Sequence, residues 1–311
     1  MHVRSRFGID RIDAIQRIVT VLALVGLALC STASMAAEVR DDRGERVFVA
    51  DGGARRIVAL AAHFVDVLSE VSAIDRLVAA DANARRLLVG KNVTLIDAMP
   101  PPSPERILAL RPDLVLAWRH GIARDWTRRV REAGVPVYVT STDTLDGIGK
   151  MLVDMSVLLG DSSTEGLRAA QTAHAWRVAL EALRNRYSSR APVRVVYQIW
   201  RSPLIVAGGR GFIDDALKAC GARNVFADLR VTSATVGREA VIVRRPELVL
   251  TSDIEGTRAM WEGFGLVSAS GPTRFAAVDD RRLHRPSPTM LDALRGLCDS
   301  IDQARTALHT R

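Results

Sequence analysis

The sequence predicts an α/β protein in which two similar lobes are joined by one long helix. Short apolar runs of strand length alternate with helix-like stretches on both sides of residues 161–187, an order typical of a mainly parallel sheet. Residues 161–187 contain no proline, and no glycine follows Gly166, so we expect one continuous helix there. The sequence pattern that follows Glu105 is repeated in similar form after Glu239. A weak internal repeat on either side of a long helix indicates two related lobes.

The N-terminal residues predict export from the cytoplasm. Four arginines precede an apolar run over 18–30, and the small residues Ser34 and Ala36 stand where a signal peptidase reads. We therefore interpret residues 1–37 as a secretory signal peptide and expect a periplasmic mature chain. A retained anchor is the alternative, but the apolar run is short for a membrane span. Lipidation at Cys30 is a second alternative, but Leu29, the residue before it, is bulkier than the usual lipidation motif allows.

Length and charge narrow the class of protein. The chain has 311 residues, 48% of them hydrophobic, which is enough for two lobes with cores of their own. Loss of residues 1–36 removes four arginines and two aspartates and lowers the formal charge from +8 to +6. The remaining arginines are scattered, whereas a nucleic-acid interface needs a concentrated basic stripe, so we exclude that function.

Two cysteines that remain after export, Cys220 and Cys298, suggest a disulfide. The bridge would close a long loop, which is worth about 4 kcal/mol in the chain-entropy model. Two buried free thiols are the alternative.

The first predicted lobe, about residues 38–144, has elements in strand–helix order. Asp42-Arg43-Gly44 indicates a hairpin turn, and Ser103 with Pro104 marks a helix start, because serine caps well and proline fits the first helical position. We expect a hairpin over 39–49, a loop over 82–102, strands at 56–60, 77–80, 114–117 and 135–139, and helices at 63–71, 104–111 and 122–133.

The linking helices, or spine, are predicted at about residues 145–190. The first helix should span 145–159, and the second should begin with a capping box of Ser162 and Glu165. A helical stripe is expected to face the protein, formed by Leu167, Ala170, His174, Val178, Ala182 and Leu183.

The second predicted lobe, about residues 191–311, repeats the first. The segment 237–251 has the same order of helix, Arg-Pro and apolar strand as the segment after Glu105. We also expect strands at 193–199 and 275–278, and helices at 212–220 and 288–308.

Short motifs give no catalytic or metal site. Gly209 and Gly211 lie between a strand and a helix, but Asp214 stands where a dinucleotide loop needs its third glycine. Residues 147–150 lack the remainder of a phosphate loop, and the histidines are too far apart in the sequence to show ligand spacing. We therefore expect no enzyme activity, no cofactor and no bound metal.

Two tryptophans indicate a ligand site. Trp118 and Trp200 each follow a predicted strand directly, and ligands of open α/β sheets bind beyond the carboxyl ends of strands. We expect both indoles to face a cleft between the lobes, although each could instead cap the core of its own lobe. Arg119, His120 and Arg201 lie next to them.

Several segments resemble one known family. They are PERILALRPDLVLAWR at 104–119, CGARNVF at 220–226 and, more loosely, Tyr197-Gln198 with Ser202-Pro203, Arg238-Glu239, RPSP at 285–288 and Leu297-Cys298. On these residues the chain resembles periplasmic solute-binding proteins of ABC importers, of the class with a rigid helical backbone. Within that class it is most similar to the cobalamin-binding proteins, over nearly the whole mature chain.

The resemblance implies two Rossmann-like lobes on a long rigid helix, and capture of a cobalamin-type corrinoid in the cleft for delivery to an ABC permease dimer. It supports a Cys220–Cys298 bridge. It also implies that Glu105 and Glu239, one at a helix start in each lobe, dock on basic permease residues. A favourable place in the first helical turn is the local alternative. We expect a monomer whose candidate ligand-binding residues are Trp118, Trp200, His63, Arg119 and Arg285.

Other ligands and functions stay open. The loops before the two glutamates hold Met99, Pro100 to Pro102 and Val231 to Val236, with no aromatic residue. Within the family, the alternatives are haem, with His63 or Tyr197 as an axial ligand, and a ferric siderophore held by arginine. Outside it, they are a secreted α/β enzyme and a scavenger or sensor without a transporter.

Overall fold

A computed structural model describes residues 37–262, 264, 266–268 and 271–309. The predicted signal peptide lies outside these residues apart from Ala37, where the first strand begins. Within the described ranges, no helix combines the length and the apolar character needed to span a membrane.

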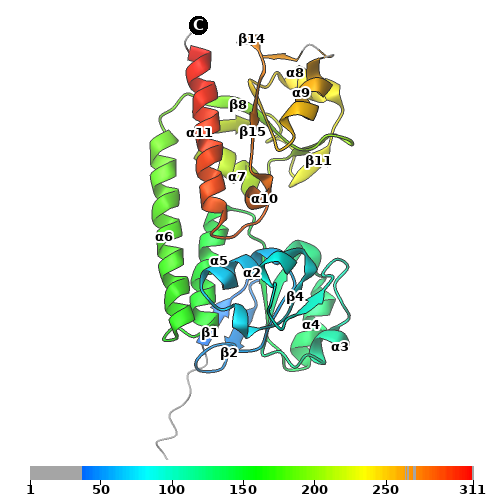
Figure 1. The fold of residues 1–311 in the computed structure, drawn as a ribbon, viewed down its shortest axis with the longest axis vertical. Coiled ribbons are helices and arrows are strands. Elements are labelled where there is room, and N and C mark those ends of the chain that lie inside the picture. Colours follow the sequence, from blue (N-terminus) through cyan, green and yellow to red (C-terminus); the bar gives the residue numbers. More distant parts are fainter. Residues whose placement is uncertain (1–36, 263, 265, 269–270, 310–311) are drawn as a thin grey trace, which may run out of the picture. The chain divides into compact units, whose positions relative to one another are not determined.

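The first lobe is built on a five-stranded parallel sheet in the order β5-β4-β3-β6-β7 (Figure 1). Apart from β5 its strands are almost entirely buried, as expected of a parallel sheet covered on both faces. The strands are β3 (Ile57–Ala59), β4 (Leu77–Asp81), β5 (Thr94–Ile96), β6 (Leu114–Trp118) and β7 (Val137–Thr140). Strand β5 lies where the sequence predicted only a loop; it has only three residues, and Thr94 and Leu95 are exposed.

Short helices and a hairpin complete the first lobe. Ser103 caps its helix as predicted, because its Oγ accepts the Arg106 backbone N–H at 3.4 Å. The helices are α2 (Ala62–Glu70), α3 (Pro104–Leu108) and α4 (Arg124–Glu132), with short 3-10 turns at Ile74–Arg76, Ala82–Leu87 and Arg119–Gly121. Strands β1 (Ala37–Arg40) and β2 (Arg46–Val49) form the predicted hairpin.

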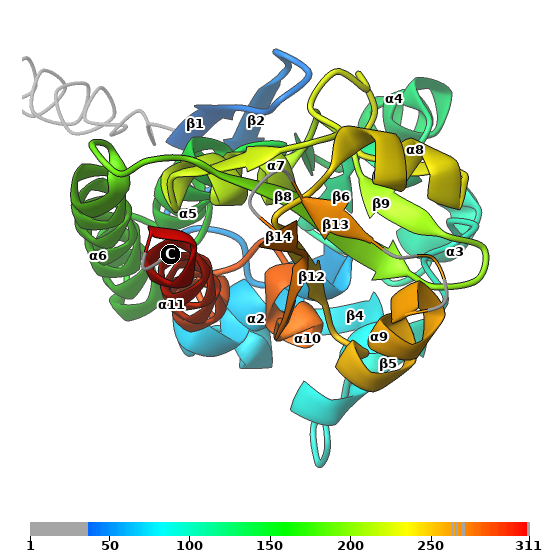
Figure 2. The same ribbon diagram turned by 90° about the horizontal axis from the view of Figure 1, so that it is seen from above.

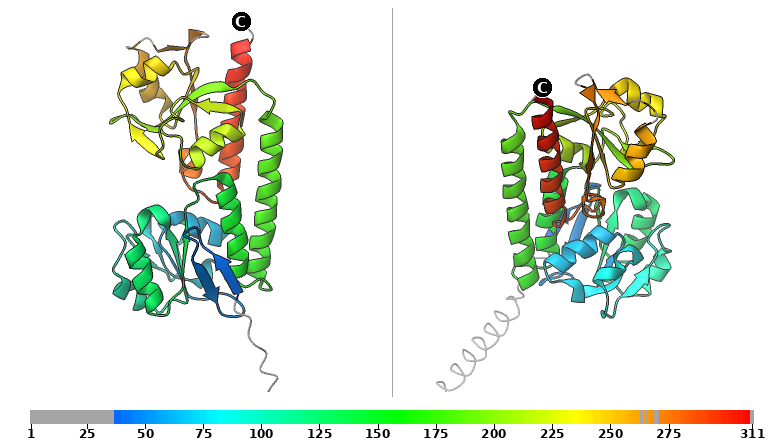
Figure 3. Two further views of the ribbon diagram at one scale, coloured as in Figure 1. Left: turned by 180° about the vertical axis from the view of Figure 1, so that it is seen from behind. Right: turned by 45° about the horizontal axis from the view of Figure 1, so that its top comes forward.

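Two long helices, α5 (Leu145–Leu158) and α6 (Thr164–Tyr187), pack against each other. Helix α6 runs beside both lobes, whereas α5 lies beside the first lobe (Figures 1 and 3). The predicted capping box is wrong by one residue. Ser163 Oγ accepts the Gly166 N–H at 2.9 Å, and Glu165 binds Arg76 instead.

The predicted buried stripe of α6 is wrong except at Leu183. Leu167 and Val178 are 53% and 48% exposed, whereas Trp176 is 2% exposed and donates from its indole to the Leu145 carbonyl. The buried face instead follows Ala169, Ala173, Trp176, Leu180, Leu183 and Tyr187. The large side chains of Trp176 and Tyr187 lie on the buried face of the helix. The sequence prediction had instead placed the stripe of mostly aliphatic residues on that face.

The second lobe has a mixed sheet among its described residues, with β10, β8, β12 and β15 parallel and β9 and β11 added antiparallel (Figure 2). Its strands are β8 (Val193–Trp200), β9 (Ile205–Ala207), β10 (Ala222–Asn224), β11 (Ser233–Thr235), β12 (Leu248–Thr251) and β15 (Arg274–Ala277), with a separate pair β13 (Val267–Ser268) and β14 (Gly271–Pro272). Its helices are α7 (Phe212–Ala219), α8 (Arg238–Arg244), α9 (Ile254–Glu262), α10 (Asp280–Leu283) and α11 (Met290–His309). The predicted alternation and the predicted α/β class with two lobes are confirmed.

The predicted disulfide is present. Cys220, directly after α7, is bonded to Cys298 in α11 with an S–S distance of 2.02 Å, and both residues are fully buried. The bridge fastens the last helix to the body of the second lobe.

Candidate functional site

Both lobes line one cavity of about 490 Å³, within the usual range of about 300–1,000 Å³ for small-molecule sites. Each strand of the first sheet contributes to it at or just beyond its carboxyl end: His63 after β3, Asp81 and Asn83 at β4, Met99 after β5, Trp118 at β6, and Ser141 and Asp143 after β7. The second lobe contributes Ile199, residues 210–213, Thr232, Ser233 and residues 284–286. Parallel strands bring their carboxyl ends to one edge, so residues far apart in sequence meet there.

Trp118 is fixed on the cavity wall. Its indole Nε1 donates a hydrogen bond to the Ser141 carbonyl at 3.1 Å, which joins the ends of β6 and β7. The His120 ring meets the indole edge-on, with ring centroids 5.0 Å apart. A Cβ at Gly121 would lie 3.1 Å from the Met99 sulfur and 3.8 Å from the indole, so glycine lets these side chains approach. The result is an apolar wall with its polar edge satisfied.

A polar pair stands beside this wall. His120 Nε2 lies 2.9 Å from Asp143 Oδ1, and both side chains are about two-fifths exposed, at 41% and 40%. The sequence placed His120 next to Trp118 but did not predict Asp143. The pair can offer a ligand both a donor and an acceptor.

A buried charged group lies on the side of the cavity where α2 meets the segment after α10. Arg285 Nε is 3.0 Å from Asp66 Oδ2, which links the two lobes. Burial raises the pKa of Asp66 to about 6, although the Arg285 charge opposes this. Burial and then the Arg285 charge lower the pKa of His63 to about 3, so the imidazole is neutral. The His63 Nε2 and Arg285 Nη2 atoms have no hydrogen-bond partner among the described residues.

Tyr197 is buried rather than open to the cavity. Its hydroxyl lies 3.1 Å from His284 Nε2, and the side chain is fully buried. His284 lines the cavity, and burial lowers its pKa. Tyr197 therefore supports a cavity residue, whereas the haem alternative treated it as an axial ligand.

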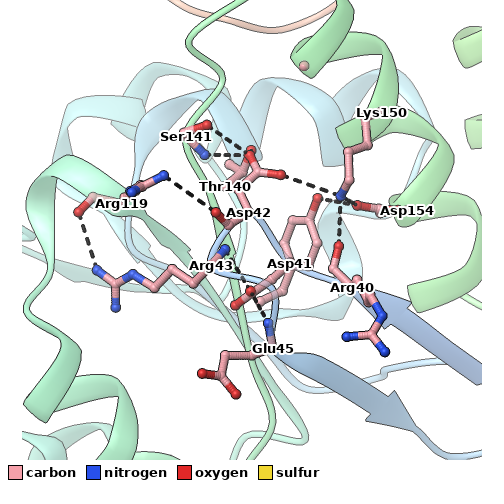
Figure 4. Close-up of polar contacts among 12 residues, drawn as sticks. Arg40, Asp41, Asp42, Arg43, Glu45, Arg119, Thr140, Ser141, Lys150 and Asp154 are labelled. Carbon is pink, nitrogen blue, oxygen red and sulfur yellow. Dashed lines mark hydrogen bonds and ion pairs between the residues drawn. The ribbon is translucent and has the colours of Figure 1, made fainter.

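Two predicted ligand-binding residues lie elsewhere. Trp200 is 62% exposed, donates to the Ser202 carbonyl, and is not among the described residues that line the cavity. Ile199, one position earlier in β8, lines the cavity instead, because neighbouring strand residues point to opposite faces. Arg119 turns to the N-terminal hairpin, where its Nη1 reaches the Asp42 carbonyl at 3.5 Å (Figure 4). His63, Trp118 and Arg285 are brought together as expected.

The hairpin that receives Arg119 is held in place by contacts of Asp42 and Lys150. The Asp42 carboxylate accepts hydrogen bonds from the Thr140 hydroxyl and the Ser141 N–H at 2.9 and 2.7 Å (Figure 4). Lys150 Nζ donates to the Arg40 carbonyl at 2.7 Å. These contacts hold the loop after β7, and therefore the Ser141 carbonyl that binds Trp118.

Glu105 and Glu239 lie outside the cavity, in the first turns of α3 and α8, and both are exposed. Each belongs to the same position of the internal repeat, and the following strands β6 and β12 pair in parallel with β3 and β8. The expected placement of one glutamate at a helix start in each lobe is therefore observed.

The sequence prediction missed Asp81, Asn83, Asp143 and Arg210 as cavity residues. The signal that could have found the first three is the rule already applied to Trp118, because each lies at or just beyond the carboxyl end of a strand. Arg210 lies in the turn before α7 and reaches the cavity from the second lobe. In the described part of the chain, no group of three or more His, Cys, Asp or Glu side chains is arranged to hold a metal ion.

Comparison with known proteins finds one family. The family model of periplasmic binding proteins matches residues 57–265. The curated vitamin B12-binding proteins of Vibrio campbellii and Vibrio cholerae are 27% and 29% identical to the chain. These alignments cover 82% and 81% of this chain and 92% and 91% of the relatives.

Solved structures with the same fold include binding proteins for two kinds of ligand. The periplasmic vitamin B12 binding protein BtuF of Vibrio cholerae has a TM-score of 0.69 at 28% identity, covering 81% of this chain and 98% of that one. The periplasmic haem-binding protein BhuT in complex with two haems has a TM-score of 0.66 at 22% identity, covering 82% and 100%. At this identity, the similarity to BhuT shows only that the two proteins share a fold.

Proposed function

Because the chain belongs to the periplasmic binding protein family, we propose that it is the periplasmic ligand-capturing component of an ABC importer and has no catalytic role. In this proposal, residues 38–144 and 191–311 are the lobes, residues 145–190 are the spine, and the protein acts as a monomer. The cavity at the carboxyl ends of five parallel strands supports it, since ligands of α/β sheets bind there.

The ligand that we propose is a cobalamin-type corrinoid. The observation that carries this choice is Trp118, whose indole is fixed on the cavity wall by its hydrogen bond to the Ser141 carbonyl and by the edge-on contact with His120. A corrin ring has a broad apolar face, which suits an aromatic wall, and a rim of amides and a phosphate, which suits Asn83 and the arginines Arg210 and Arg285. The vitamin B12-binding relatives support the same choice.

The absorption spectrum of protein purified from its native host tests this choice. We expect corrinoid bands, and stoichiometric quenching of tryptophan fluorescence when cobalamin is added to the stripped protein. A haem Soret band in the purified protein would contradict the corrinoid assignment. So would the absence of any fluorescence response to added cobalamin when another ligand quenches the Trp118 fluorescence at the same concentration.

Haem is the second candidate, and one observation favours it. His63 lines the cavity, and burial keeps its imidazole neutral, with a nitrogen lone pair free for iron. Its Nε2 atom is buried and has no hydrogen-bond partner among the described residues, so ligation would require the side chains around it to move aside. Titration with haem distinguishes the candidates: a Soret shift that disappears in His63→Ala would favour haem.

We further propose that Glu105 and Glu239 dock on an ABC permease dimer at the inner membrane. Two exposed carboxylates at equivalent places of two lobes match a two-fold partner with one cationic patch on each subunit. Such charges set association rate and orientation, and salt screens them. The Glu105→Ala, Glu239→Ala double variant should keep its fold and ligand affinity but lose docking and uptake.

A further inference from the structure

The two glutamates proposed for docking differ in their surroundings. Glu105 Oε1 accepts a hydrogen bond from Arg129 Nη2 at 2.6 Å, so this carboxylate already has a cationic partner within the chain. Its own backbone N–H, the Ser103 hydroxyl and Arg129 lower the pKa of Glu105, which keeps it ionised. Both side chains are exposed, at 66% for Glu105 and 50% for Arg129, so an external cation can reach the same pair.

The internal repeat provides a comparison for this pair. Helix α9 has the same nine-residue length as α4 and repeats a buried threonine followed by arginine, with a glutamate at the end. The matching residues are Thr127, Arg128 and Glu132 in α4 and Thr257, Arg258 and Glu262 in α9.

In this alignment the position of Arg129 is taken by Ala259. Ala259 is exposed and carries no charge. Among the described ion pairs of the chain, none involves Glu239, whereas Glu105 forms the pair with Arg129. The Glu105 carboxylate of the first lobe is therefore already paired with a cation of the chain, whereas the Glu239 carboxylate of the second lobe is in none of the described ion pairs.

We propose that Arg129 is an intramolecular competitor that weakens docking through the first lobe, so that a two-fold permease meets two unequal contacts. This inference rests on the proposed docking role of Glu105 and Glu239. A permease cation that approaches Glu105 must displace the Arg129 guanidinium or share the carboxylate with it. It also meets the positive charge of Arg129. Among the described residues Glu239 forms no such ion pair, so the second lobe makes the stronger contact.

The size of the effect follows from the exposure of the pair. Ion pairs between exposed side chains are weak, so the competition should reduce affinity by about two- to five-fold. It should be largest at low ionic strength, since salt screens both the internal pair and its rival.

The decisive experiment measures docking of ligand-loaded protein to the host's own corrinoid permease–ATPase complex in nanodiscs of neutral lipid. Arg129→Gln should bind about two- to five-fold more tightly than wild type. Arg128→Gln is the matched control, because it removes the same charge one residue earlier, where the guanidinium binds Asp125 and Glu132. An effect of net charge alone would appear equally in both variants.

A mutant cycle completes the test. In the wild-type background Glu239→Gln should weaken docking more than Glu105→Gln, and in the Arg129→Gln background the two losses should become equal. If neither glutamate variant weakens docking, the proposed docking surface is wrong and the inference falls with it. If both weaken docking but Arg129→Gln binds no more tightly than Arg128→Gln, only the inference fails and the docking proposal stands.

Discussion

Arg111 and Arg245 adopt the same left-handed backbone conformation, with φ of +48° and +46°, and each stands directly before a proline. The backbone carbonyl of each accepts a hydrogen bond from the Nε atom of another arginine in the same lobe. Arg56 donates to Arg111 at 2.9 Å, and Arg194 donates to Arg245 at 3.4 Å. A conformation that is uncommon for non-glycine residues thus occurs at the same position in both halves of the repeat, with the same kind of support. The internal repeat therefore extends to backbone geometry.

Replacement of Arg111 by glycine tests how much this conformation costs. The left-handed region costs an ordinary residue about 1–2 kcal/mol, and glycine loses about 0.4–1 kcal/mol by making the unfolded chain more flexible. We expect Arg111→Gly to raise the free energy of unfolding by up to about 1 kcal/mol. In the control Arg106→Gly, in helix α3, it should fall by about 1 kcal/mol. Urea denaturation measures both, and equal changes would contradict the account.

Trp118 and Trp200 should differ in ligand binding, because Trp118 lines the cavity and Trp200 does not. Trp118→Ala should weaken cobalamin binding by about 1.5–3 kcal/mol, the usual loss for a buried aromatic anchor. Trp200→Ala should leave affinity unchanged. Titration calorimetry gives both values, and circular dichroism checks that each variant is folded. Unchanged affinity in Trp118→Ala would remove Trp118 from the site.

His63 and Asp66 should compensate for each other in the pH dependence of stability. Burial lowers the pKa of His63 from 6.5 to about 3, so its contribution is present above pH 6.5 and is lost as the pH falls. Burial raises the pKa of Asp66 from 3.8 to about 6, so its contribution is complete below pH 3.8 and is lost as the pH rises to 6. Between these limits the two slopes have opposite signs, each at most ~1.4 kcal/mol per pH unit.

Single variants should therefore reveal the separate slopes. Relative to wild type, the free energy of unfolding of His63→Gln should fall between pH 4 and pH 6, because only Asp66 then titrates. For Asp66→Asn it should fall as the pH is lowered over the same window, because only His63 titrates. Urea denaturation at three pH values suffices, and three parallel profiles would rule the account out.

The disulfide should contribute strongly to stability. Cys220 and Cys298 are separated by 78 residues, and closing a loop of that length is worth about 4 kcal/mol in the chain-entropy model. The Cys220→Ala, Cys298→Ala variant should lose about that amount, and reduction of the wild type should have a comparable effect. A loss below about 1 kcal/mol would show that the reduced chain keeps the two helices together by other contacts.

Ligand binding should change the angle between the lobes only slightly. Arg184 of α6 binds both carboxylate oxygens of Asp146 at 2.9 Å and lies 3.6 Å from Asp215 of α7. Asp215 also accepts the Leu145 N–H at the start of α5 at 2.8 Å. Because these contacts join the spine to the second lobe without a hinge loop, scattering curves with and without cobalamin should superimpose. A clear fall in the radius of gyration on binding would contradict this.

The sequence by itself determined the alternation of strands and helices, the continuity of α6 and the repeat, because these depend on local spacing of apolar residues and on proline and glycine positions. It also indicated the pairing of Cys220 with Cys298, since one pair remained after export. It failed at β5, which is only three residues long and lies in a segment interpreted as a loop. It was also wrong about the buried face of α6, where the packing of Trp176 overrides the aliphatic stripe.

Only the tertiary structure decided which side chains meet. The rule for strand ends placed Trp118 on the cavity wall, but one step along β8 turned Trp200 outward and Ile199 inward, because strand side chains alternate. The pairs Arg285–Asp66 and Arg129–Glu105 join segments that no local pattern connects. Their formation depends on how helices pack across long sequence separations, and that packing sets both the charges at the cavity and the difference between Glu105 and Glu239.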